Sequence, residues 1–200
     1  MEKKYILTDE TIEYLGHTLH RIKAVKDFAT ISAGTLGGYI ESEKNLDHDG
    51  NAWVSDDAWV SDDAWVTGDA WVTGDAWVTG DAWVTGDARV TGDAMVTGDA
   101  WVTGDARVTG DAMVTGDAMV TGDAMVRETS DIALIKGFGS KLRATSFFRC
   151  VDGLVRCQCG CFYGTVDEFR SKVRETHGNS KYAKEYLMIA DLMELHFKED

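Results

Sequence analysis

Four cysteines offer the densest set of metal-ligating side chains in this 200-residue chain. Cys150, Cys157, Cys159 and Cys161 lie within twelve positions of one another, too close in sequence to staple a fold of this length. Structural zinc sites usually place two residues between paired cysteines, whereas one residue separates the last three here. Those three alternate along an expected strand and would share a face. We predict reduced, half-buried cysteines and no bound metal, with zinc held by the four thiolates as the alternative.

Histidines are the usual candidates for acid–base catalysis, and their positions in this chain argue against that role. All five lie toward the two ends of the chain: His17, His20, His48, His177 and His196. The segment 51–137 contains no histidine and no inserted loop that could build a substrate pocket. We therefore expect no catalytic residue, no cofactor and no enzymatic activity.

The middle segment is an internal repeat with a period of six residues. From Asn51 it reads NAWVSD, DAWVSD, DAWVTG four times, DARVTG, DAMVTG, DAWVTG, DARVTG, DAMVTG twice and DAMVRE. A period of six is neither the 3.6 of a helix nor the alternation of a plain strand. With a Gly or Asp corner in each unit, it indicates a β-solenoid in which one hexad forms one side of a coil.

Side-chain size decides which residues of a hexad face the solenoid axis. In the short strand Ala-Xaa-Val, Ala and Val share one face, and Xaa, which is Trp, Arg or Met, takes the other. One coil has no room for Trp59, Trp65 and Trp71 at its axis, and Arg89 or Arg107 would be buried there without counter-charge. We predict that Ala and Val fill the axis and that Thr-Gly-Asp makes the corner. The absence of proline fits, because every interior coil must donate backbone hydrogen bonds.

The hexads resemble those of hexapeptide-repeat, left-handed parallel β-helix proteins. That resemblance implies a left-handed coil closed by three hexads, with the valine and the small residue four places later pointing inward. Many proteins of this kind are acyltransferases, which use a histidine on a coil, an extended loop and a crevice for coenzyme A. The present repeat has neither the histidine nor the loop. An acyltransferase is therefore the last of three functional alternatives.

The chain as a whole resembles a group of uncharacterised proteins of bacterial phages and prophages. The residues that carry the resemblance are Leu36–Glu41, Asn51–Val54, Cys159–Phe162 with Gly164-Thr165 and Glu168-Phe169, and His177-Gly178. The group has no established activity. A phage setting implies an accessory protein directed at host machinery.

Three hexads per coil would align residues eighteen apart into three outward columns that hold all seven tryptophans. Trp, Met and Arg are enriched at the cores of protein interfaces, so we predict that one or more faces contact another chain. The alternative is that the rings only shield the strands. The sequence does not say which face is used. The predicted contact residues of the columns are Trp53, Trp59, Trp65, Trp71, Trp77, Trp83, Trp101, Arg89 and Arg107.

The net charge of −14 comes almost entirely from the repeat, since residues 51–137 contribute −12. An acidic balance argues against direct binding to nucleic acid or a membrane surface. Aspartates in three corner rows would instead place one charge per roughly 1.6 Å of axis, close to the value of about 1.7 Å for duplex DNA. This motivates DNA mimicry; the alternatives are solubility and, less favoured, cation binding. The predicted contact aspartates are Asp63, Asp69, Asp75, Asp81, Asp87, Asp93 and Asp99.

The segments on both sides of the repeat are predicted to form capping structures for the solenoid. Residues 5–31 indicate a β-hairpin around Leu15–His17, and residues 147–157 indicate a second hairpin with a turn at Asp152-Gly153. Thr165 and Glu168 form a capping box for a helix that ends near Gly178. Ser180 then caps a helix through Phe197.

The expected fold is mainly β: an N-terminal β cap over residues 1–50, a left-handed β-helix over 51–137 and an α+β module over 138–200. We expect a cytoplasmic, homo-oligomeric, non-enzymatic phage protein in the bacterial host cell. Its partner would be a host protein with a basic surface, such as a nucleic-acid-acting or defence protein, which it inhibits. The first alternative, ahead of an acyltransferase, is a structural or assembly protein that joins copies through the solenoid faces.

Overall fold

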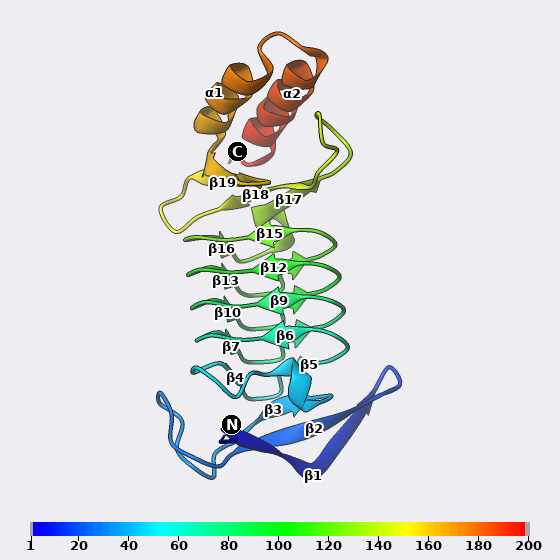
Figure 1. Ribbon diagram of the computed structural model, residues 1–200, viewed down its shortest axis with the longest axis vertical. Coiled ribbons are helices and arrows are strands. Elements are labelled where there is room, and N and C mark those ends of the chain that lie inside the picture. The colour runs from blue at the N-terminus through cyan, green and yellow to red at the C-terminus, as the bar shows by residue number, and fades with distance from the viewer. Residues whose placement is uncertain (1, 199–200) are drawn as a thin grey trace.

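The computed structural model describes residues 2–198 and is dominated by a β-solenoid of about five turns. The coils stack along the long axis of the molecule, with antiparallel strands at the N-terminal end and two helices at the other (Figure 1). None of the helices in the described residues is long and apolar enough to cross a membrane.

Thirteen two-residue strands form the solenoid, one for each hexad. They pair in parallel with a step of eighteen residues, so that Trp71 aligns with Arg89 and Trp83 with Trp101. The first stack consists of β4 (Trp53–Val54), β7 (Trp71–Val72), β10 (Arg89–Val90), β13 (Arg107–Val108) and β16 (Met125–Val126). The second contains β5 (Trp59–Val60), β8 (Trp77–Val78), β11 (Met95–Val96) and β14 (Met113–Val114). The third is β6 (Trp65–Val66), β9 (Trp83–Val84), β12 (Trp101–Val102) and β15 (Met119–Val120).

The predicted axial positions of Ala and Val and the predicted corners are confirmed. The alanines and valines of the repeat are at most 1% exposed and form one continuous core. Each corner glycine has a positive φ, for example +73° at Gly86. A Cβ at Gly86 would lie 3.0 Å from the backbone nitrogen of Gly104 in the next coil, so a side chain there is disfavoured by space as well as by conformation. The left hand of the coil stays a prediction from the repeat.

Antiparallel strands at the N-terminus continue one of the three stacks. Strands β1 (Tyr5–Tyr14) and β2 (His17–Ala24) pair through a two-residue turn at Leu15-Gly16. Strand β3 (Leu36–Ile40) pairs antiparallel with β2 and parallel with β5, where Ile40 aligns with Val60. The parallel stack therefore begins before the first hexad. A 3-10 turn, η1 (Glu43–Asn45), follows β3.

The C-terminal module is a four-stranded antiparallel sheet under two helices. After the 3-10 turn η2 (Thr129–Asp131), it comprises β17 (Ile132–Ile135), β18 (Thr145–Arg149), β19 (Val155–Cys159) and β20 (Phe162–Thr165). Helices α1 (Val166–His177) and α2 (Lys181–His196) follow, with N-caps at Thr165 and Ser180, so both cap predictions are confirmed. The predicted repeat region, 51–137, includes the residues of β17. In the structure these residues pair with β18, because the hexad pattern has already ended.

Candidate functional site

The three solenoid faces carry similar outward residues but differ in what covers them. We name each face by its first tryptophan: the Trp53 face (β4, β7, β10, β13, β16), the Trp59 face (β5, β8, β11, β14) and the Trp65 face (β6, β9, β12, β15). The predicted columns agree with the strand register on all three faces. Any contact surface for a partner must therefore be sought where the chain leaves a face open.

The N-terminal hairpin covers the start of the Trp59 face. The Tyr14 ring packs edge-on against Trp59 at 4.4 Å and against Trp77 at 5.0 Å between ring centroids. Leu19 and Tyr39 complete this small apolar cluster, and Trp59 is only 6% exposed. Trp59 is thus an internal contact of the protein, not the partner contact that the sequence predicted.

The segment before the hexads covers the start of the Trp53 face. Trp53 is fully buried, with Tyr5 and Phe28 packed edge-on against its ring at 6.4 and 5.3 Å. The prediction of Trp53 as a partner contact is therefore also wrong, because other parts of the same chain enclose its side chain. Farther along this face, Arg89 and Arg107 are exposed.

A groove of about 540 Å³ runs along the Trp53 face beyond its covered end. The arginines of this face form no ion pair within residues 2–198, although aspartates of the neighbouring corner row share the groove. Its lining residues are Ala29, Asn51, Asp69, Trp71, Asp87, Arg89, Asp105 and Arg107. Mixed charge makes this groove a poor match to a single class of charged ligand.

The Trp65 face is the open aromatic surface of the described chain. Trp65, Trp83 and Trp101 are 36%, 36% and 40% exposed. Trp83 and Trp101 stack almost parallel, with ring centroids 5.0 Å apart and an interplanar angle of 3°, whereas Trp65 meets Trp83 edge-on. The rings shield the strands between them and still present a continuous apolar ladder to solvent.

Corner aspartates border the Trp65 face on both sides. One row, starting at Asp63, lies before its strands in sequence, and the other, starting at Asp69, lies after them. At the ends of the first row, Asp63 pairs with Lys44 at 2.6 Å and Asp117 pairs with Lys136. Between these ends, Asp81 and Asp99 are exposed and form no ion pair in the described part of the chain. The open tryptophans are therefore flanked by free negative charge.

The third aspartate row lies between the Trp53 and Trp59 faces and does not border the Trp65 face. It contains Asp57, Asp75, Asp93 and Asp111, all exposed. The structure thus separates the predicted contact aspartates into two groups. Asp63, Asp69, Asp81, Asp87 and Asp99 border the open tryptophans, whereas Asp75 and Asp93 do not.

The four cysteines do not converge on one point. Cys150 packs into the solenoid core, whereas Cys157 belongs to the apolar core under the helices. Burial raises the pKa of the Cys150 thiol to about 11 and that of Cys157 above its usual range, so both thiols stay protonated. Cys161 is exposed in the turn after β19, which corrects the expectation that it shares a strand face with Cys157 and Cys159.

A cavity of about 640 Å³ lies in the C-terminal module beside the two helices. Arg170 lines it and forms ion pairs with Asp167 at 2.9 Å, Asp191 at 2.9 Å and Glu194 at 2.5 Å. Because Arg170 lies on α1 and two of its partners lie on α2, these contacts tie the helices together. The arginine is already neutralised, so we assign it a structural role.

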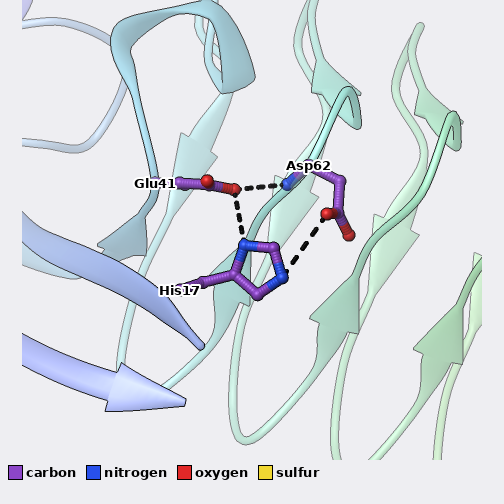
Figure 2. Close-up of side chains that lie close together, drawn as sticks. All are labelled: His17, Glu41 and Asp62. Atoms are coloured by element: carbon purple, nitrogen blue, oxygen red, sulfur yellow. Dashed lines mark hydrogen bonds and ion pairs between the residues drawn. The ribbon is translucent and has the colours of Figure 1, made fainter. Parts of the chain in front are cut away.

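A histidine and two carboxylates meet where the N-terminal hairpin touches the solenoid. His17 Nδ1 lies 3.2 Å from Glu41 Oε2, and His17 Nε2 lies 3.6 Å from Asp62 Oδ1 (Figure 2). Sequence reasoning missed this cluster because its members come from three separate segments. One signal was present: Asp62 occupies a corner position that is glycine in the ten following hexads.

Comparison with known proteins adds no assignment: no protein-family model matches the chain, and no curated protein matches it.

Proposed function

We propose that this protein is a non-enzymatic binding protein that uses the Trp65 face and its two bordering aspartate rows to grip a basic surface of another protein. The observation that carries the proposal is the exposure of Trp65, Trp83 and Trp101 on one face, while the chain's own N-terminal segment encloses Trp53 and Trp59. Tryptophans at the centre of an interface supply most of its binding energy, and surrounding charges set specificity and association rate.

The charge pattern supports a partner that normally binds nucleic acid. The outward residues of the Trp65 face are three tryptophans and a methionine, so no positive side chain lies between its two aspartate rows. Arg89 and Arg107 lie on the other side of the row that starts at Asp69, in the groove of the Trp53 face. Carboxylates repeated once per coil, about 4.8 Å apart along each row, resemble the regular charge of a phosphate backbone. A basic nucleic-acid groove would accept such a surface, and the tryptophans would add contacts that DNA lacks.

The biological setting of this proposal rests on the resemblance to phage and prophage proteins. A rigid acidic rod that occupies the nucleic-acid groove of a host enzyme or defence protein would block that protein without chemistry of its own. The left-handed hexapeptide coil and the bacterial cytoplasm belong to the same proposal.

Self-assembly is the second candidate. The near-parallel stack of Trp83 on Trp101 forms a flat apolar ladder that a second copy could cover. This candidate requires two strongly acidic surfaces to approach each other, since the rows on both sides of the ladder would meet like charges. That repulsion favours a basic partner over a second copy.

The two acidic groups of the solenoid provide a matched test. One variant carries Asp81→Asn, Asp87→Asn, Asp99→Asn and Asp105→Asn, which neutralise the rows beside the Trp65 face. The control carries Asp57→Asn, Asp75→Asn, Asp93→Asn and Asp111→Asn and removes the same charge elsewhere. Each is used to capture proteins from a bacterial lysate, with and without excess duplex DNA as competitor.

We expect the wild type and the control to retain a basic partner that duplex DNA displaces, and the first variant to lose it. Equal retention by both variants would contradict the proposal. A third variant distinguishes partner binding from self-assembly; it carries Trp65→Ser, Trp83→Ser and Trp101→Ser. Loss of the partner at unchanged mass by light scattering supports partner binding, whereas a fall in mass supports self-assembly.

A further inference from the structure

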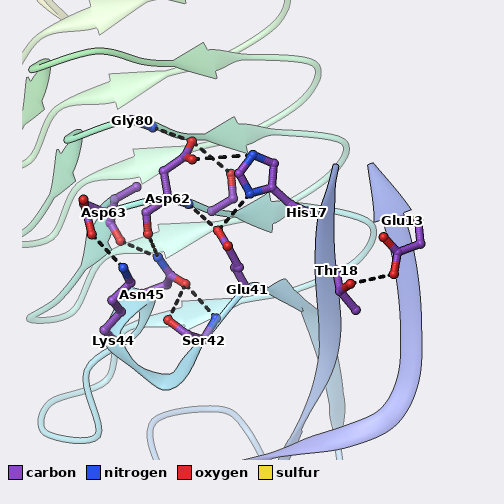
Figure 3. A network of polar contacts seen from close by, with 12 residues as sticks. Glu13, His17, Thr18, Glu41, Ser42, Lys44, Asn45, Asp62, Asp63 and Gly80 are labelled. Carbon is purple, nitrogen blue, oxygen red and sulfur yellow. Dashed lines mark hydrogen bonds and ion pairs between the residues drawn. The ribbon is translucent and has the colours of Figure 1, made fainter. Parts of the chain in front are cut away.

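The side chains of His17, Glu41 and Asp62 converge from three parts of the fold. His17 is the first residue of β2, Glu41 follows β3 directly, and Asp62 sits at a corner of the second hexad (Figure 3). One potential ligand atom from each residue lies within 4.8 Å of the others. In residues 2–198 this is the one group of three histidine, cysteine or carboxylate side chains with that spacing.

Neighbouring backbone groups hold the two carboxylates in place. Glu41 Oε2 accepts a hydrogen bond of 2.6 Å from the Asp62 backbone N–H, and Asp62 Oδ2 accepts one of 3.1 Å from the Gly80 backbone N–H. Asp62 Oδ1 remains directed at the imidazole (Figure 2). Neither carboxylate pairs with a lysine or arginine in the described part of the chain.

A neutral imidazole at this position cannot donate a hydrogen bond to both carboxylates. A neutral imidazole has a single N–H, yet both ring nitrogens of His17 face carboxylate oxygens. If Nδ1–H donates to Glu41, the lone pair of Nε2 faces the lone pairs of Asp62 Oδ1. A cation between Nε2 and Oδ1 would turn this repulsion into attraction.

The spacing suits a transition-metal ion. Zinc binds imidazole nitrogen and carboxylate oxygen at about 2.0–2.2 Å, which places two ligands of a tetrahedral ion about 3.4 Å apart. The gap of 3.6 Å between Nε2 and Oδ1 is too long for a hydrogen bond and close to this value. A carboxylate that accepts the other imidazole proton, as Glu41 can, is the usual partner of a metal-bound histidine.

From this geometry we infer that His17, Glu41 and Asp62 form a divalent transition-metal site, with Zn²⁺ as its probe. His17 and Asp62 supply ligands, and Glu41 orients the imidazole or completes the ligand set by a small rotation. The ion joins the hairpin to the solenoid corner, so it strengthens the contact that covers the Trp59 face. The site is structural and separate from the Trp65 face.

Two equivalent corners of the repeat allow a substitution that removes a metal-ligating side chain to be compared with a matched control. Asp56 and Asp62 both have positive φ, 57° and 59°, where the later hexads have glycine. Asp56 Oδ2 also accepts a hydrogen bond from a glycine in the next coil, Gly74, at 3.2 Å. In residues 2–198, Asp56 belongs to no such group of metal-ligating side chains with a histidine. Asp62→Gly and Asp56→Gly therefore make the same change to the corner, and only the first removes a ligand.

The experiment titrates the full chain, stripped with a chelator, with Zn²⁺ at about pH 8, where a free imidazole is neutral. We expect one equivalent of Zn²⁺ to bind and to raise Tm. Asp62→Gly and His17→Gln should each weaken binding at least about tenfold, with the far-ultraviolet circular dichroism unchanged, whereas Asp56→Gly should bind like the wild type.

Cobalt(II) separates this site from the cysteines. Binding to His17 and the carboxylates gives weak visible bands, whereas binding to Cys159 or Cys161 adds intense thiolate bands in the near ultraviolet. Thiolate bands, or Zn²⁺ affinity that Asp62→Gly leaves unchanged, would overturn the inference. So would stabilisation that appears on acidification but not on addition of Zn²⁺, because a proton would then be the only cation that the cluster accepts.

Discussion

The Trp59 face and the Trp65 face are built from hexads of the same kind, yet the first is largely covered at its start and the second is open. Trp59 is 6% exposed beneath Tyr14, whereas Trp65, in the next hexad, is 36% exposed. The difference does not arise in the repeat. It arises from the N-terminal hairpin, which continues the stack of the Trp59 face through the pairing of β3 with β5.

An outward tryptophan in this solenoid therefore has no fixed role. The core positions are decided within each hexad, because Ala and Val are its small apolar side chains and fill the axis. The outer positions are decided by whatever else the chain lays over them. A covered tryptophan contributes to folding, and an uncovered one remains available for a partner.

The largest expected difference between a covered and an open tryptophan is in the free energy of unfolding, and a pair of alanine substitutions measures it. Trp53→Ala should lower the free energy of unfolding by about 3–5 kcal/mol, because it empties a fully enclosed position between Tyr5 and Phe28. Trp83→Ala should cost about 1–2 kcal/mol, because its ring is partly exposed and mainly loses stacking on Trp101. Urea denaturation followed by circular dichroism measures both. Equal losses would show that exposure does not separate the two faces.

Much of the solenoid follows from the sequence, because its constraints are local and repeated. Valine and alanine at the axis, glycine at the corner and alignment every eighteen residues all follow from size and backbone conformation, and all are confirmed. The caps at Thr165 and Ser180 are equally local and are also confirmed.

The site could not be read in the same way, because it depends on contacts between distant segments. No period in the sequence places Tyr14 on Trp59 or brings His17 to Asp62. Those contacts depend on the pairing of β2 with β3 and of β3 with β5. The sequence therefore predicted a tryptophan surface without identifying the open face.

A smaller loss of stability should follow when the Trp59 face is partly uncovered. Tyr14→Ala removes two edge-on contacts, to Trp59 and Trp77, each worth about 0.5–1.5 kcal/mol. We expect a modest loss of stability and a clear rise in acrylamide quenching of tryptophan fluorescence. Tyr182→Ala, an exposed tyrosine on α2 far in sequence from any tryptophan, serves as the control. If quenching stays the same in both variants, the hairpin does not shield the Trp59 face in solution.

The smallest effect concerns the layer over Trp53, which is held by a buried lysine. Lys4 Nζ donates a hydrogen bond of 2.8 Å to the Ala52 carbonyl and lies 5.1 Å from the centre of the Phe28 ring, which in turn packs on Trp53. Burial lowers the pKa of Lys4 from 10.5 to about 8. The folded chain therefore releases this proton at lower pH than the unfolded chain does.

Because the pKa of Lys4 is lower in the folded chain, its contribution to stability depends on pH. Below about pH 8 the lysine is protonated in both states, and the cost of burying its charge is fully present. From about pH 8 toward 10.5 the unfolded chain binds more protons at this site, so the Lys4 contribution to the free energy of unfolding rises by at most about 1.4 kcal/mol per pH unit. Lys4→Met removes this slope, and urea denaturation at about pH 8 and pH 9 measures it, where Tyr5 of the unfolded chain is still largely protonated. Parallel stability curves for the two proteins would mean that Lys4 is solvated, and that the layer over Trp53 is as open as the Trp65 face.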